Sequence, residues 1–337
     1  MAPVASFRVT LQPSGHSFTT DGSDSVLQAA LDAGLTLPYG CRNGACGACK
    51  GRVIDGLVDH GLAQEQALPT ADRVSGLALF CCAKPLSDLV LECREVGTAK
   101  DIPVKIMPCR VQKIERVAED VIVLSLKLPA NERLQFLAGQ YIEFLLKDGK
   151  RRAFSIANAP HDDGFLQLHV RLIAGGEFTQ HVFAGMKEKD ILRFQGPYGS
   201  FFLREESAKP MILLAGGTGF APIKALVEHA IHHHITRPME IYWGARNRGG
   251  LYLPDLPQEW AAAHGHIRYA PVLSDEAWEG RTGLAHKAVL EDHPVLSAFQ
   301  VYACGAPAMI DAARADFVAA GLPPEEFFAD AFTFAPA

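Results

Sequence analysis

The sequence has 337 residues, enough for two or three domains, and 48% of them are hydrophobic, so that each domain can bury its own core. The formal net charge of −6 and the lack of a dense Lys/Arg run argue against nucleic acid as a partner. The first residues do not read as a signal peptide, and no apolar run approaches the roughly 18 residues that span a membrane. These features predict a cytoplasmic protein without a membrane partner, in which the eight cysteines are metal ligands or buried thiols.

The first part of the chain predicts a small β-grasp-like domain. Residues 7–11 and 16–20 alternate apolar and polar side chains around a glycine, as in a hairpin. Ser25 is placed to cap a helix that ends near Gly34, and further strands are expected at 50–55 and 89–94. We expect this domain to span residues 1–96.

A cysteine-rich loop follows the predicted helix and is the most specific motif of the chain. Cys41, Cys46 and Cys49 are spaced as C-x4-C-x2-C, and Cys81 and Cys82 come about thirty residues later. This is the plant-type iron–sulfur spacing, in which four thiolates hold two irons. A structural zinc site would more often pair its ligands as two C-x2-4-C units, and a disulfide framework fits poorly in a long chain without an export signal. The loop therefore predicts a 2Fe–2S cluster.

The middle of the chain predicts an antiparallel β-barrel. Residues 97–108 are polar and contain proline, and we interpret them as a linker. From residue 109 to 205, short strands at 140–146, 152–156, 166–172 and 191–195 are separated by Gly, Pro or Asp turns, after a strongly alternating stretch at 109–128. One helix is expected at 178–186.

Two segments of this barrel could bind a dinucleotide. An arginine precedes Phe154 and Ser155 on a strand, and two glycines open the single helix, where backbone N–H groups form an anion site. Together the arginine and the helix start could hold two phosphates, although an exposed strand and a routine turn are the alternative. The candidate cofactor-binding residues here are Arg152, Phe154, Ser155, His169, Arg171, Gly175, Gly176, Phe178 and Thr179.

Residues 206–337 change to strand, glycine turn and helix, which predicts a parallel α/β sheet. Strands are expected at 211–215, 239–244 and 300–303, with a helix at 221–232. The glycine turn departs from G-x-G-x-x-G but lies where such sheets bind pyrophosphate. Arg246 could contact a ribose or a 2′-phosphate, and an ordinary exposed loop arginine is the alternative there. Cys304 ends a strand of the same sheet, and a buried structural thiol is the alternative there. The candidates are Gly217, Thr218, Gly219, Pro222, Arg246, Cys304 and Gly305.

Taken together, the three parts resemble the single-chain reductases that join a plant-type ferredoxin domain to a ferredoxin–NADP reductase-like module. Reductase components of bacterial ring-hydroxylating dioxygenases have this order, and so does the reductase of the CDP-6-deoxyhexulose dehydrase pathway. The resemblance covers essentially the whole chain. It implies a multidomain α+β and α/β fold: a β-grasp ferredoxin domain, a β-barrel FAD domain (109–205) and an NAD(P)-binding domain (206–337).

The resemblance also implies roles for individual residues. The cluster ligands are Cys41, Cys46, Cys49 and Cys81, because the segment 79–85 fits the frame around the family's fourth ligand. Arg152, Phe154 and Ser155 match the flavin motif, the segment 175–179 matches the FAD pyrophosphate segment, and 217–222 and 304–305 match the nicotinamide-nucleotide positions. Asp330 corresponds to an acidic residue, often Glu, and Phe332 to an aromatic one.

The implied activity is electron transfer from NADH or NADPH through FAD and a 2Fe–2S cluster to a terminal oxygenase. A nicotinamide gives two electrons at once and the cluster takes one at a time, so a flavin must stand between them. Ser155, Cys304 and Asp330 are the expected catalytic residues. The same electron chain could serve a CDP-6-deoxyhexulose dehydrase; a redox sensor without turnover and a flavin-free ferredoxin are weaker alternatives. We expect a monomer that binds its iron–sulfur acceptor transiently, next to Arg42, Asn43 and Ala45.

Overall fold

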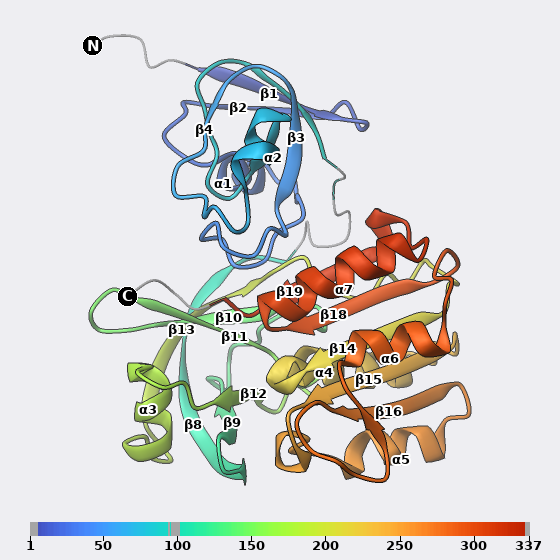
Figure 1. Cartoon of the computed structure of the whole chain (residues 1–337). Coiled ribbons are helices and arrows are strands. Elements are labelled where there is room, and N and C mark those ends of the chain that lie inside the picture. Colours follow the sequence, from blue (N-terminus) through green and yellow to red (C-terminus); the bar gives the residue numbers. More distant parts are fainter. Residues whose placement is uncertain (1–5, 94, 96–101, 334–337) are drawn as a thin grey trace. The chain divides into compact units, whose positions relative to one another are not determined.

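The computed structural model describes residues 6–93, 95 and 102–333 (Figure 1). These residues divide into two compact units, one at the N-terminal side up to Ile102 and the other from Pro103 to Phe332. The predicted end of the first domain, at Val96, and the first part of the predicted linker, residues 97–101, lie outside the described residues. No helix in the described part of the chain is long and apolar enough to cross a membrane.

The N-terminal unit is built on a five-stranded sheet in the order β2-β1-β7-β3-β5, in which β1 runs antiparallel to β2 and parallel to β7. Helix α1 begins after Ser25, whose hydroxyl accepts a hydrogen bond from the Gln28 amide at 3.2 Å. The predicted hairpin, capped helix and strand at 50–55 are confirmed. The elements are β1 (Phe7–Gln12), β2 (Ser17–Thr20), α1 (Val26–Asp32), β3 (Lys50–Asp55), β4 (Val58–Asp59), α2 (Thr70–Val74), β5 (Leu77–Leu79), β6 (Lys84–Pro85) and β7 (Leu89–Glu92).

The second unit begins with a six-stranded antiparallel barrel in the order β11-β10-β13-β8-β9-β12. The barrel closes where Ile156 bridges Leu168 and the Ala157 amide donates to the Gln167 carbonyl at 2.7 Å. Closure leaves no free sheet edge at this point. The elements are β8 (Lys105–Ala118), β9 (Val121–Lys127), β10 (Tyr141–Leu145), β11 (Arg151–Ser155), β12 (Leu166–Arg171), α3 (Glu177–Ala184) and β13 (Ile191–Tyr198).

Strand β8 starts at Lys105, inside the range that the sequence predicted as a linker. Pro108 suggested irregular structure there, because proline cannot donate a ladder hydrogen bond. In the barrel this proline pairs only with β13, opposite Arg193, and the pairing of β8 with β9 begins later, at Arg110. One side of the strand is therefore free at Pro108, and the missing N–H is tolerated.

The rest of the second unit is a six-stranded, wholly parallel sheet in the order β17-β16-β15-β14-β18-β19. Its central strands β14, β15 and β18 are mostly buried, as expected for a sheet covered on both faces. The elements are β14 (Met211–Gly216), η1 (Gly217–Gly219), α4 (Phe220–His232), β15 (Met239–Ala245), η2 (Arg248–Gly250), α5 (Asp255–Ala263), β16 (Ile267–Leu273), β17 (Arg281–Thr282), α6 (Ala285–Asp292), β18 (Gln300–Gly305), α7 (Pro307–Ala319), η3 (Pro324–Glu326) and β19 (Phe327–Ala331).

The strand order reverses at β14. From β14 the chain proceeds outward through β15 to β16, and it then returns to place β18 and β19 on the other side (Figure 1). Parallel sheets of this kind bind ligands beyond the carboxyl ends of the strands at such a reversal. The glycine turn after β14 and Cys304 at the end of β18 both lie there.

Candidate functional site

The four cysteines predicted as cluster ligands form two pairs in the N-terminal unit. The Cys41 amide donates to the Cys46 sulfur at 3.3 Å, and the Cys46 thiol lowers the pKa of Cys41 to about 6. The Cys81 amide donates to the Cys49 sulfur at 3.5 Å. A hydrogen bond between the two thiol groups raises the pKa of Cys81. Among the described residues, no group of three or more His, Cys, Asp or Glu side chains is arranged to hold a single metal ion. Two thiolate pairs suit a cluster of two irons better than a single metal.

Cys82 lies beside this set. Its sulfur is 3.7 Å from the Cys81 sulfur, and a Cβ at Gly44 would lie only 2.7 Å from it. Gly44 has a φ of +78°, so that glycine is required there both by conformation and by space. Cys82 therefore packs against the cysteine loop at Gly44.

The predicted flavin motif lies at the end of β11. Phe154 is half-buried and its ring centre is 5.5 Å from that of Phe178 and 5.8 Å from that of Phe144. Phe178 is itself buried in the barrel core. The half-buried Arg152 donates to the Arg151 carbonyl at 2.8 Å.

The helix start predicted to bind phosphate is a glycine turn that leads into α3. Gly175 has a φ of +76° and Gly176 caps α3. Thr179 folds back over this turn: its hydroxyl accepts from the Ile173 amide at 3.1 Å and donates to the Gly176 carbonyl at 3.0 Å. The Thr179 side chain thus stabilises the turn from within.

Arg171 supplies positive charge between the barrel and the glycine turn. A Cβ at Gly217 would lie 3.2 Å from its Nη1, so the guanidinium lies directly against the turn. Its Nε and Nη2 are buried without a hydrogen-bond partner in the described part of the chain, although Nε lies 3.4 Å from an Asp120 carboxylate oxygen. A buried donor without a partner is costly, and a phosphate at this place would satisfy it.

The glycine turn and the end of β18 approach each other so closely that no side chain fits between them. A Cβ at Gly219 would lie 2.1 Å from the Cys304 carbonyl oxygen, and one at Gly305 would lie 3.1 Å from the Gly216 Cα. The Trp243 indole N–H holds the turn by donating to the Gly217 carbonyl at 2.9 Å. Thr218 is half-buried on the same turn, and Pro222 is buried in the first turn of α4.

The three predicted catalytic residues come together from three strands. The Ser155 hydroxyl, on barrel strand β11, donates to an Asp330 carboxylate oxygen at 3.3 Å, and both side chains are buried. Asp330 on β19 is in register with Cys304 on β18. Burial, and then the charge of Asp330, raise the pKa of Cys304, which keeps this thiol protonated. The half-buried Phe332 is tied down at the same edge by its amide, which donates to the Gly305 carbonyl at 2.8 Å.

Two candidates are placed differently from the others. His169 is buried, with its Nδ1 2.8 Å from the Tyr252 hydroxyl, so it joins the barrel to the nucleotide-binding sheet. Burial, and then the charge of Lys224, lower the pKa of His169 to about 3. Tyr252 and Trp243 were not predicted, because neither belongs to a motif. Arg246 is exposed after β15, where the neighbouring Arg248 pairs with glutamates.

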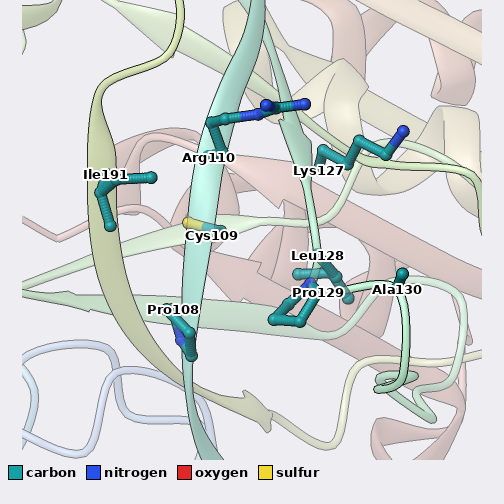
Figure 2. Close-up of a pocket in the computed structure, with 8 residues that line it drawn as sticks. All are labelled: Pro108, Cys109, Arg110, Lys127, Leu128, Pro129, Ala130 and Ile191. Atoms are coloured by element: carbon teal, nitrogen blue, oxygen red, sulfur yellow. The ribbon is translucent and has the colours of Figure 1, made fainter.

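A pocket on the barrel lies apart from all of these residues (Figure 2). It is lined by Pro108, Cys109, Arg110, Lys127, Leu128, Pro129, Ala130 and Ile191, from β8, the end of β9 and the start of β13. None of the predicted cofactor-binding residues lines it. This pocket is therefore not part of the candidate site.

Fold and site together define an oxidoreductase that transfers electrons between a nicotinamide nucleotide, a flavin and a 2Fe–2S cluster. Three domain families match the chain: the 2Fe-2S iron-sulfur cluster binding domain at residues 9–86, the oxidoreductase FAD-binding domain at 108–203 and the oxidoreductase NAD-binding domain at 213–315. The chain belongs to the family of single-chain ferredoxin–flavin reductases that combine these three domains.

Relatives match along almost their entire length. The chain is 46% identical to the CDP-6-deoxy-L-threo-D-glycero-4-hexulose-3-dehydrase reductase of Yersinia pseudotuberculosis, over 97% of this chain and 98% of that protein. It is 34% identical to reductase component 1 of terephthalate 1,2-dioxygenase from a Comamonas species, over 98% of each. A solved structure, the Amycolatopsis cytochrome P450 reductase, matches with a TM-score of 0.79 and 34% identity, over 97% of this chain and 99% of that one.

Proposed function

We propose that this reductase oxidises NADH or NADPH at the meeting point of Ser155, Asp330 and Cys304 and passes electrons to a separate acceptor protein. The observation that carries the proposal is the 3.3 Å hydrogen bond from Ser155 to Asp330, because it joins the predicted flavin-binding barrel to the nucleotide-binding sheet at one buried point. A flavin bound to the barrel and a nicotinamide bound to the sheet would meet there.

The chain's own residues mainly bind and orient the reacting rings. Arg152, Arg171 and the turn before α3 would hold phosphates, and the tight Gly219–Cys304 approach leaves room for the nucleotide over the strand ends. Ser155 holds the Asp330 carboxylate in place, and the protonated Cys304 adds no charge beside it. A bound flavin would supply the step from two-electron to one-electron chemistry. Positioning of this kind can lower the activation barrier of a reaction by several kcal/mol.

Electrons would leave through the N-terminal unit. We propose Cys41, Cys46, Cys49 and Cys81 as the cluster ligands, supported by their arrangement in two close pairs. Arg42, Asn43 and Ala45 are half-buried on the same loop and would border the acceptor's docking site. The complex is proposed to be transient and the reductase monomeric.

The acceptor is the part of the function on which the relatives differ. A terminal oxygenase was the first expectation from the sequence, and relatives named as oxygenase reductase components support it. The greater identity to the dehydrase reductase, 46% against 34–36%, favours a dehydrase of that kind as the acceptor. Both are tested by mixing the reduced protein with each purified acceptor and following reoxidation.

The first experiment is an anaerobic titration with NADH, and separately NADPH, followed by visible absorbance and low-temperature EPR. We expect flavin bleaching together with the signal of a reduced 2Fe–2S centre. Bleaching without that signal would contradict the proposed ligands, and no bleaching with either nucleotide would contradict the function. Asp330→Asn should slow bleaching by about 10-fold or more, because it replaces the charged partner of a buried hydrogen bond.

A further inference from the structure

One face of helix α4 lies against the barrel segment that follows the predicted flavin motif. The Lys224 Nζ donates to the Ala157 carbonyl at 3.3 Å. One helical turn later, Glu228 accepts a hydrogen bond from the Ala159 backbone amide. Lys224 and Glu228 also form an ion pair with each other at 2.8 Å. Two successive turns of α4 are therefore bonded to the backbone of two alternate residues of the barrel.

A third turn of α4 continues this pattern at the surface. His232 stacks on His161, with 3.8 Å between the ring centres and an angle of 7° between the ring planes. Residues four apart lie on one face of a helix, about 6 Å apart along its axis, and two residues of chain span at most about 7 Å. The spacing of positions 224, 228 and 232 on α4 thus matches that of positions 157, 159 and 161 in the barrel.

The Lys224–Glu228 pair is better suited to fixing a position than to adding stability. Only 10% of the Lys224 side chain and 25% of the Glu228 side chain are exposed. Burial raises the pKa of Glu228, and the charge of Lys224 acts against this. Taking two charges out of water costs about as much as their attraction returns, so a buried pair of this kind contributes little to the free energy of unfolding.

Apolar packing already joins α4 to the barrel. A Cβ at Gly139 would lie 3.3 Å from the Leu226 Cδ2, and Ala138 and Phe201 of the barrel share one core with Leu226. Apolar burial is not directional, so it leaves the helix free to shift along the barrel. The ion pair and its backbone partners have directional bonds, and they fix the register of the helix.

The two ends of this contact lead to the reacting groups. Ala157 follows Ser155 by two residues, and its amide donates to the Gln167 carbonyl at 2.7 Å, so this segment is also held within the barrel. Helix α4 begins at Phe220, directly after the glycine turn at 217–219. A shift of α4 along the barrel segment would therefore move the glycine turn relative to Ser155.

We propose that Lys224 and Glu228 are positioning residues, which fix the register of α4 on the barrel and so set the distance between a nicotinamide at the glycine turn and a flavin at Ser155. This inference rests on the proposed function, because it assumes that the two rings bind at these places. The pair acts through Ala157, Ala159 and the helix, and touches neither ring.

The test compares wild type with the double variant Lys224→Met, Glu228→Met, which removes both charges and keeps the length of the side chains. On the flavin-loaded protein, the limiting rate of flavin reduction by NADH should fall about tenfold or more, since a displacement of about 1 Å can cost about 10²-fold. The affinity for NAD⁺, measured by calorimetry, should stay within about twofold, because binding and the reacting geometry are separate quantities. The melting temperature should change little.

Two spectroscopic and structural readouts report the geometry directly. The long-wavelength absorbance that arises when nicotinamide and flavin rings stack should weaken in the double variant. Hydrogen–deuterium exchange of the backbone at 157–163 should become faster. Lys287→Met is the matched control, because Lys287 on α6 pairs with Asp316 at 2.6 Å and belongs to no contact of α4 with the barrel. It should leave the rate, the absorbance and the exchange unchanged.

The variant Glu228→Gln keeps the shape of the side chain and decides the question where the double variant does not fold. It should lower the limiting rate by a smaller factor and speed up exchange at 157–163. An unchanged rate and absorbance in the variants would overturn the inference, and so would a rate that falls only in proportion to FAD content and melting temperature. Failure of both nucleotides to bleach the wild-type flavin would instead contradict the proposed function.

Discussion

The close approach of the glycine turn to β18 can be tested with a single added methyl group, in the variant Gly219→Ala. Gly219 has ordinary helical backbone angles, with a φ of −58°, so alanine meets no conformational penalty there. The effect is purely steric. The new Cβ would lie 2.1 Å from the Cys304 carbonyl oxygen and 2.9 Å from the Gly305 amide nitrogen, and both are backbone atoms that cannot rotate away.

The size of the effect follows from these distances. Ordinary contact begins at 3.4 Å, so the turn and the end of β18 must separate by more than 1 Å. Overpacking of this kind typically costs about 1–3 kcal/mol of stability. Displacing a bound reactant by about 1 Å can lower its rate by about 10²-fold. We therefore expect a modest loss of thermal stability and a large loss in the rate of flavin reduction.

The assay is stopped-flow bleaching of the flavin by NADH under anaerobic conditions. Gly265→Ala is a matched control in the same sheet domain, because a Cβ there meets nothing within 4 Å and the residue has no positive φ. FAD content and the cluster spectrum should be unchanged in both variants, since the substitution lies outside the barrel and the cysteine loop. If flavin in Gly219→Ala were bleached by NADH at the same rate as in wild type, the steric reasoning would be refuted.

Three other predictions concern the ligands, the docking loop and the buried histidine. Cys81→Ser should abolish the reduced-cluster EPR signal while flavin content and NADH binding stay unchanged. Cys82→Ser, which alters the neighbouring thiol, should keep the signal; loss of the signal in Cys82→Ser but not in Cys81→Ser would reassign the fourth ligand. Arg42→Glu removes a guanidinium that donates to Gln28 at 3.0 Å, and should slow acceptor reduction while NADH–dye reduction continues; equal loss in both assays would contradict a docking role. His169 has a pKa of about 3 when folded and about 6.5 when unfolded, so its unfolded form binds the extra proton and stability falls as the pH drops from about 6.5 toward 3. His169→Gln should therefore show a shallower loss of melting temperature over that range, and an unchanged slope would argue against a neutral buried imidazole.

Much of this protein could be predicted from local sequence patterns. The C-x4-C-x2-C spacing, the alternation of the barrel strands and the strand–glycine–helix order after residue 209 each lie within a short stretch, and each indicates one kind of element or ligand. Such patterns depend on the preferences of neighbouring residues along the chain. For this reason the cysteine loop, the capped helix α1 and the parallel sheet were predicted correctly.

The tertiary structure decided which of these stretches meet. Ser155 and Asp330 are separated by 175 positions and His169 and Tyr252 by 83, and no local period relates the members of either pair. The same holds for Arg171, which lies against Gly217 because the closed barrel brings β12 to the glycine turn. Strand β8 could start at Lys105 only because Pro108 has no neighbour on one side. Contacts of this kind depend on how the sheets close and stack, which is set by long-range burial rather than by the order of residues within any one segment.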